Sequence, residues 1–121
     1  MTGEEFVKGI ERTVRDASNR DTFTLLERPP GRNPRASLVA QSTWYRSLAP
    51  RERELLSGIV RLAVDQALFG FFCVIDGTRF IEDGPDRGSF ELHYVRGSTT
   101  PLYTADTPML HELYESLSHD S

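Results

Sequence analysis

The pattern of apolar residues changes at Gly70, and this change constrains the fold more than any other feature of the chain. Apolar residues recur at helical spacing over residues 50–69. Ala49-Pro50 is typical of a helix start, because proline lacks an N–H group that would have no partner there. Glycine favours helix termination. We therefore predict a helix over residues 50–69 that ends at Gly70.

This predicted helix has a wide apolar arc. Its polar side is a narrow stripe formed by Glu54, Gly58, Arg61 and Asp65. A helix whose apolar arc is broader than one face is normally covered on more than one side. We therefore expect this helix to be the central helix of the fold, with neighbours on several sides.

After Gly70 the pattern becomes typical of extended segments. Residues 71–75 are continuously apolar. Asp76-Gly77 is the dipeptide that best supplies the two positive-φ positions of a tight hairpin turn. We therefore predict that residues 71–75 and 78–81 form two paired strands.

Two further strands are predicted in the C-terminal half of the chain. Residues 89–96 alternate apolar and polar side chains, as a half-buried strand does. Gly97-Ser98 then predicts a turn into residues 99–103. The fold class that follows is α+β. It would be an antiparallel meander of three or four strands packed against a central helix, with one helix at each end of the chain.

The first of these end helices has a clear start. Thr2 and Glu5 have the spacing of a capping box, in which each residue binds the other's backbone N–H. Apolar residues then recur at helical spacing, which predicts a helix over residues 3–17. Ser18-Asn19 is the expected stop.

Residues 19–48 are predicted to be an irregular segment rich in proline and arginine. Prolines at high density oppose regular helices and sheets over residues 19–35, and residues 36–47 fit either a helix or a strand. A last helix is predicted to follow Thr107-Pro108 and to carry an apolar stripe. Residues 118–121 are expected to fray.

The length of 121 residues suits a single domain over residues 1–121.

Composition indicates a cytoplasmic protein of bacterial type. The chain has one cysteine, so an intrachain disulfide is excluded, and the acidic start differs from a secretion signal. The longest apolar run, residues 67–75, is broken by Gly70 and too short to span a bilayer.

The net charge is −4, but residues 20–53 carry seven arginines and three acids while residues 76–121 carry nine acids and three arginines. Faces of opposite charge would favour a protein partner or self-association.

A metal site is one hypothesis for the acidic residues of the predicted sheet. Glu91 and His93 lie two residues apart, so they share the outer face of a strand. Glu82 and Asp83 would lie near them if the strands pair as predicted. Carboxylate oxygens and an imidazole suit Mg²⁺, Mn²⁺ or Zn²⁺. A solvated polar face with turn-forming aspartates is the simpler interpretation.

Two features indicate partner binding. The segment from Arg28 to Arg35 is stiffened by prolines and carries three arginines, which could bind phosphate, nucleic acid or an acidic protein patch, with stacking from Trp44. A solvated loop is the simpler interpretation, and the acidic chain makes nucleic acid the least favoured ligand. The predicted strand 71–75 is apolar on both faces, and its second face could be covered by helices or the Trp44 segment of the same chain, or by a partner or second subunit. The residues predicted to bind a partner are therefore Arg28, Arg32, Arg35, Trp44, Phe72 and Val74.

No catalytic residue, cofactor or nucleic-acid motif is predicted. Cys73 lies among apolar residues, which favours a buried structural thiol over a nucleophile. The leading hypothesis is a non-catalytic protein-binding module, such as an inhibitor, an immunity-type protein or a regulatory accessory. The alternative is a small metal-assisted hydrolase that uses the acidic cluster, and a homodimer that presents the arginine segment is a third hypothesis.

Overall fold

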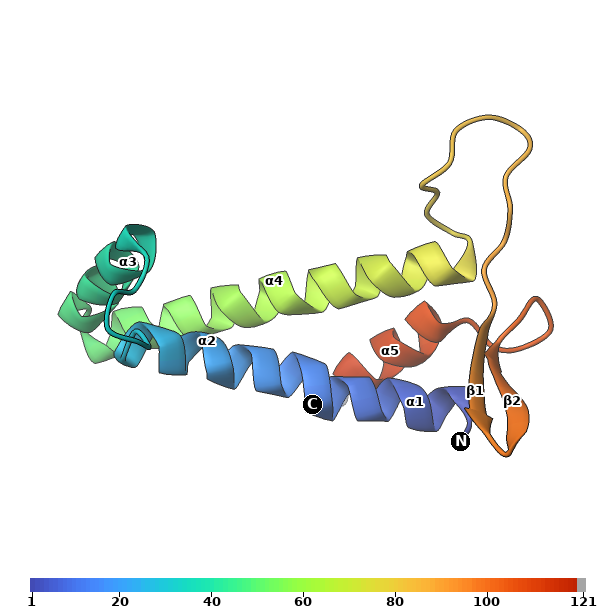
Figure 1. Cartoon of the computed structure of the whole chain (residues 1–121), viewed down its shortest axis with the longest axis horizontal. Coiled ribbons are helices and arrows are strands. Elements are labelled where there is room, and N and C mark those ends of the chain that lie inside the picture. The colour runs from blue at the N-terminus through green and yellow to red at the C-terminus, as the bar shows by residue number, and fades with distance from the viewer. Residues whose placement is uncertain (120–121) are drawn as a thin grey trace. The chain divides into compact units, whose positions relative to one another are not determined.

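The computed structural model describes residues 1–119 (Figure 1). The protein is α+β, with helices and a two-stranded antiparallel sheet in this part of the chain. The chain divides into two compact units. One is Val14–Asp65, and the other combines Met1–Thr13 with Gln66–Ser121. The single domain over residues 1–121 stays a prediction.

Helix α1, Gly3–Ile10, begins where the sequence predicts. Thr2 Oγ1 accepts a hydrogen bond from the backbone N–H of Glu5 at 3.1 Å, and this bond satisfies one of the free donors of the first turn. Glu4 and Glu5 in that turn also complement the helix dipole. The capped start of the helix is confirmed.

The predicted end of this helix at residue 17 is wrong. A π-helix over Glu11–Asp16 continues α1 directly into α2, Ala17–Glu27, so the helical run extends from residue 3 to residue 27. Within Val14–Asp65 the ring of Phe23 packs 5.7 Å from the ring of Tyr45. This tertiary contact stabilises the helix around Phe23. The polar residues near it in the sequence would not favour a helix by themselves.

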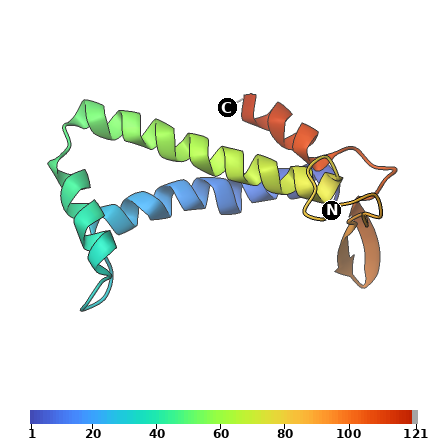
Figure 2. The same cartoon turned by 90° about the horizontal axis from the view of Figure 1, so that it is seen from above.

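Residues 19–48 are mostly helical, which corrects the irregular segment expected there. Helix α3, Ala36–Ser47, follows α2 after a loop over residues 28–35, and this loop contains the prolines (Figure 2). The prolines therefore break the helix only where they stand. Ser42 Oγ donates to the carbonyl of Leu26 at 2.6 Å and so ties α3 to the end of α2.

Helix α4, Pro50–Asp76, overturns the main prediction from the sequence. It begins at Pro50 as expected, but it passes through Gly70 and includes residues 71–75. It ends instead at Gly77, whose φ is 78°. Gly77 N–H donates to Val74 and Thr78 N–H donates to Cys73, at 3.2 and 2.9 Å, which is a Schellman C-cap. Asp76-Gly77 is therefore a helix end and not a hairpin turn.

Packing explains why α4 continues past Gly70. Phe72 and Cys73 are buried and lie four and three residues before the buried Asp76, so all three lie on the same side of the helix. The Arg79 guanidinium lies against Gly70, and a Cβ at this position would displace it. Gly70 therefore leaves space for the Arg79 side chain and does not end the helix.

The sheet is a hairpin of β1, Leu92–Arg96, and β2, Ser98–Tyr103, joined at Gly97 (Figure 1). Gly97 has a φ of 73°, which suits glycine at the tight turn that the sequence predicts. The predicted meander of three or four strands is wrong in its first half. Residues 71–75 belong to α4, and residues 78–81 form no strand.

The core of the unit formed by Met1–Thr13 and Gln66–Ser121 joins α1, α4, β2 and α5, Leu110–His119. The ring of Phe72 lies 5.4 Å from the ring of Tyr114 and 6.4 Å from that of Phe6. The buried members of this core are Val7, Phe72, Tyr103, Leu110 and Tyr114.

A frayed tail was predicted over residues 118–121. The backbone of α5 is helical to His119, and residues 120–121 lie outside the described part of the chain.

Candidate functional site

A row of exposed apolar residues lies on α4 within Val14–Asp65. Leu55, Ile59 and Leu62 are 53%, 63% and 60% exposed. Their spacing of four and three residues places them on one face of the helix. We call these three residues the α4 seam. Large aliphatic side chains that are exposed in a row, rather than singly, indicate a binding surface.

The α4 seam corrects the expectation that this helix is covered on several sides. Leu56, Val60 and Val64 lie on another face and are only partly exposed. The wide apolar arc therefore divides into a face that is partly covered and a face that is exposed. The sequence showed the residues of the seam but could not show which face would be left uncovered.

The arginine segment lies where a partner could reach it. Arg28, Arg32 and Arg35 are all exposed in the loop between α2 and α3. Trp44 is 55% exposed on α3. The accessibility that the predicted role requires is therefore present, and the role itself stays a prediction.

The structure does not support Phe72 as a partner-binding residue. Phe72 is 2% exposed and packs in the core against Phe6 and Tyr114. Val74 is partly exposed on the same helix. The prediction failed because it placed residues 71–75 on a strand, whose faces alternate with every residue, whereas on a helix the neighbour Phe71 is the exposed one.

The four residues of the metal hypothesis do not meet at one point. His93 Nε2 lies 3.1 Å from Glu91 Oε1, so these two do share a strand face. Glu82 Oε1 instead accepts from the backbone N–H of Gly88 at 3.0 Å. Among residues 1–119 no group of three or more histidine, cysteine or acidic side chains could hold a metal ion, and Asp83 therefore belongs to no such group.

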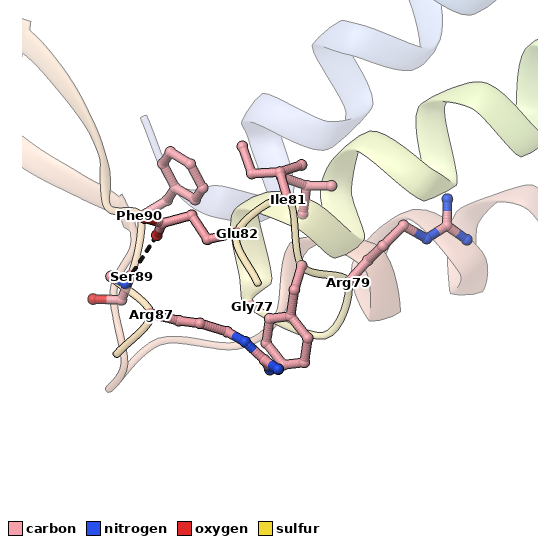
Figure 3. Close-up of a pocket in the computed structure, with 10 residues that line it drawn as sticks. Gly77, Arg79, Ile81, Glu82, Arg87, Ser89 and Phe90 are labelled. Atoms are coloured by element: carbon pink, nitrogen blue, oxygen red, sulfur yellow. Dashed lines mark hydrogen bonds between the residues drawn. The ribbon is translucent and has the colours of Figure 1, made fainter. Parts of the chain in front are cut away.

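Glu82 belongs to a small structured loop between α4 and β1 (Figure 3). The guanidinium of Arg87 lies 3.9 Å from the centre of the Phe80 ring, within the range of a cation–π contact. The loop and Val74 of α4 line a half-open depression of about 20 Å³, which has room for one water molecule. This volume is too small for an organic ligand.

A buried polar cluster that the sequence did not reveal lies at the end of α4. Asp76 is 5% exposed, and its two carboxylate oxygens accept from the backbone N–H groups of Leu110 and His111 at 3.0 and 2.7 Å. The Tyr103 hydroxyl donates to the Asp76 carbonyl at 2.9 Å. Burial, and after it the Asp76 carboxylate, raise the pKa of Tyr103 above 10.0. The cluster caps α5 and joins it to β2 and α4.

A second aromatic and charged cluster lies within Val14–Asp65. The guanidinium of Arg53 lies 4.9 Å from the centre of the Tyr45 ring and 3.8 Å from a carboxylate oxygen of Glu27. Burial, and after it the Glu27 carboxylate, raise the pKa of Tyr45 above 10.0. These contacts join α2, α3 and the first turn of α4, so they support the helix that carries the α4 seam.

Helix α4 also meets the length and hydropathy of a membrane-spanning helix. Its most apolar window of 18 residues has a mean hydropathy of 1.7, and 17% of that window is buried. The sequence-based argument against a membrane span assumed a break at Gly70, and that break is absent. The same exposed apolar surface is therefore open to a protein or to lipid.

Comparison of the chain with protein-family models, with curated proteins and with solved structures finds no match.

Proposed function

We propose that the protein is a non-catalytic protein-binding module whose binding surface is the α4 seam. The single observation behind this proposal is the exposure of Leu55, Ile59 and Leu62 along one helix face. Fully covering a large aliphatic side chain is worth about 1.5–3 kcal/mol. Three such residues in a row therefore leave a favourable free energy that a matching apolar surface could recover on binding.

The helix presents this row in a form that partner proteins recognise. Anchors at positions i, i+4 and i+7 are the pattern by which an amphipathic helix docks in an apolar groove or against another helix. The α4 seam lies on a continuous helix, so it is ordered before a partner arrives. Such ordering lowers the entropic cost of binding.

We favour a protein over a lipid bilayer as the occupant of this surface. Any 18-residue window of α4 includes both Arg61 and Asp65. Each charged side chain at the bilayer centre costs about 2.5–3.5 kcal/mol on insertion scales. In addition, Asp65 lies 4.0 Å from the buried guanidinium of Arg15, and insertion as a lone span would separate these charges.

The alternative of a metal-assisted hydrolase is not carried forward. It requires Glu82, Asp83, Glu91 and His93 to converge, and only Glu91 and His93 are in contact in the described part of the chain. The arginine segment and Trp44 are compatible with a second contact area for the same partner. We place the main contact at the α4 seam, because apolar burial contributes more to affinity than exposed charge.

Site-specific photo-crosslinking in the source cells tests the proposal. A benzophenone amino acid replaces Ile59, or for comparison Thr24, which is exposed on α2. We expect protein adducts at position 59 and none above background at position 24. A variant with Leu62→Asp should lose the adduct at position 59, because a charge on the seam opposes its burial.

Flotation with lipid vesicles distinguishes the lipid alternative. The purified wild-type chain should remain with the soluble fraction. Flotation of the wild type together with failure of an Ile59→Asp variant to float would show that the seam binds lipid. That outcome, or the absence of any adduct at position 59, would contradict the proposal.

A further inference from the structure

We propose that a hollow lined by α2 and α4, within Val14–Asp65, binds a small organic molecule through its phosphate group. The hollow is open to solvent and has a volume of about 350 Å³. Sites for small molecules run from about 300 to 1,000 Å³, so one small ligand would fill it. We call it the arginine hollow. The residues that line it are Asp16, Asn19, Arg20, Phe23, Ser57 and Arg61.

The spacing of these residues explains why their side chains meet. On the first wall they lie at positions 16, 19, 20 and 23, which share one face of the helical run that passes from the π-helix into α2. On the second wall Ser57 and Arg61 lie four residues apart on α4. Each is two residues from Ile59 and therefore about 160° around the helix from it. The arginine hollow is thus separate from the α4 seam, and its binding role is independent of the proposed function.

Three polar side chains in the arginine hollow have no partner among residues 1–119. The amide oxygen of Asn19 is buried and accepts no hydrogen bond. The Arg61 guanidinium and the Ser57 hydroxyl make no hydrogen bond or ion pair in this part of the chain. A buried polar group normally has a partner, so an unpaired acceptor indicates a donor supplied by water or by a ligand.

The charged side chains of the hollow suit an anion. Arg20 lies 3.6 Å from Asp21, and both side chains of this pair are 69% exposed. Such an exposed pair contributes at most about 1 kcal/mol, so Arg20 can exchange it for a contact with a ligand. The Asp16 carboxylate would oppose an anion, but Arg15 Nε lies 3.0 Å from its Oδ1 and balances its charge. Two guanidinium groups, those of Arg20 and Arg61, are therefore available to a ligand.

A phosphate group fits this pair of arginines. Planar guanidinium groups donate to phosphate oxygens in pairs. A phosphate monoester carries a charge of about −1.5 to −2 at neutral pH, which two arginines can balance. The unit Val14–Asp65 contains nine arginines and six acidic residues, so its net charge is +3 although the whole chain carries −4. This local excess of positive charge attracts anions to the hollow.

The remaining residues of the hollow favour an organic phosphate over the free ion. The half-buried ring of Phe23 forms an apolar part of the wall, against which a carbon skeleton can pack. A phosphate dianion has no hydrogen to donate, whereas a hydroxyl or amino group on the same ligand could donate to Asn19. Apolar walls with a few polar groups are typical of small-molecule sites.

An NMR titration of the labelled full-length chain tests the proposal. The two probes are phenyl phosphate, which joins a phosphate group to an apolar ring, and inorganic phosphate. Salt at about 0.15 M screens attraction between distant surface charges. We expect the backbone amide signals of Asn19, Ser57 and Arg61 to shift. Phenyl phosphate should bind with a Kd of about 1 mM or lower, and inorganic phosphate at least about threefold more weakly.

Arginine variants test whether binding occurs in the hollow. Arg20→Gln and Arg61→Gln should each weaken binding of phenyl phosphate at least about fivefold, because each removes a charged hydrogen bond. Arg51→Gln is the matched control and should bind as the wild type does. Arg51 is exposed on the same helix, but it pairs with Glu54 at 3.2 Å and does not line the hollow.

Three results would overturn the proposal. The first is the absence of shifts at the hollow with phenyl phosphate at up to about 20 mM, well above the expected Kd. The second is an equal loss of binding in Arg51→Gln and Arg61→Gln, which would indicate general attraction to a basic surface. The third is equal affinity for the two probes, which would contradict an organic ligand. Each leaves the α4 seam untouched, because crosslinking at position 59 tests it separately.

Discussion

Asp76 and His111 are joined twice, because one carboxylate oxygen accepts from both the backbone N–H and the ring Nδ1 of the same residue. The distances from Asp76 Oδ2 are 2.7 Å to the His111 nitrogen of the backbone and 2.6 Å to Nδ1. A carboxylate only accepts, so Nδ1 carries a proton. The residue that ends α4 thus caps the helix that begins 34 residues later at Leu110.

Removing this cap should destabilise the protein strongly. Asp76→Ala leaves the buried N–H groups of Leu110 and His111 without an acceptor, which should lower the unfolding free energy by about 2–4 kcal/mol. Asp76→Asn keeps one acceptor oxygen and should lose less. Urea unfolding followed by circular dichroism measures both, with the exposed Asp106→Ala as control. Equal stability of Asp76→Ala and the wild type would contradict the capping role.

The neighbours Phe71 and Phe72 should respond very differently to truncation. Phe72 is 2% exposed, so Phe72→Ala should cost about 3–5 kcal/mol through a core cavity. Phe71 is 61% exposed, so Phe71→Ala should change the unfolding free energy by less than about 0.5 kcal/mol in the monomer. Thermal and urea unfolding compare the pair. A larger loss for Phe71→Ala would mean that the register of α4 past Gly70 is different.

Gly70 and Arg79 should be energetically coupled. Replacing glycine by alanine inside a helix normally stabilises it by about 1 kcal/mol. Here the added Cβ must displace the Arg79 guanidinium, so Gly70→Ala should gain less than that amount. In an Arg79→Ala background the full gain should return. A double-mutant cycle measures the coupling, and strict additivity would show that the two side chains do not compete.

Stability should fall at alkaline pH, in part because of Tyr103. Its pKa is raised above 10.0 in the folded state, mainly by burial. The folded chain holds the phenol proton more tightly than the unfolded chain, so this stabilisation is complete below about pH 10 and is lost as pH rises through the folded-state pKa. Tyr45 contributes with the same sign.

The variant Tyr103→Phe separates this contribution. It should lose about 1 kcal/mol at neutral pH, because the hydrogen bond to the Asp76 carbonyl is removed. Its stability should then decline less steeply than that of the wild type above about pH 10. Urea unfolding at a series of pH values gives both quantities. Parallel pH profiles for the two proteins would contradict the assignment.

Features that depend on a few neighbouring residues could be predicted from the sequence. The Thr2 cap, the start of α4 at Pro50 and the turn at Gly97 were all predicted, and all three are present. In each case the physical cause lies within four residues of the feature, in a hydroxyl, a missing N–H or a glycine at positive φ. The α+β class followed from the same local signals.

The sequence by itself determined where α1 and α4 begin and where the turn between β1 and β2 lies, whereas only the tertiary structure decided how far α4 runs and which of its faces is exposed. The run from Phe71 to Ile75 is apolar at every position, so its period cannot distinguish a buried strand from a buried helix. Its conformation is settled by distant partners, since Phe72 packs on Tyr114 and Asp76 binds the N-terminus of α5. Such contacts link residues more than thirty positions apart, and no local pattern encodes them.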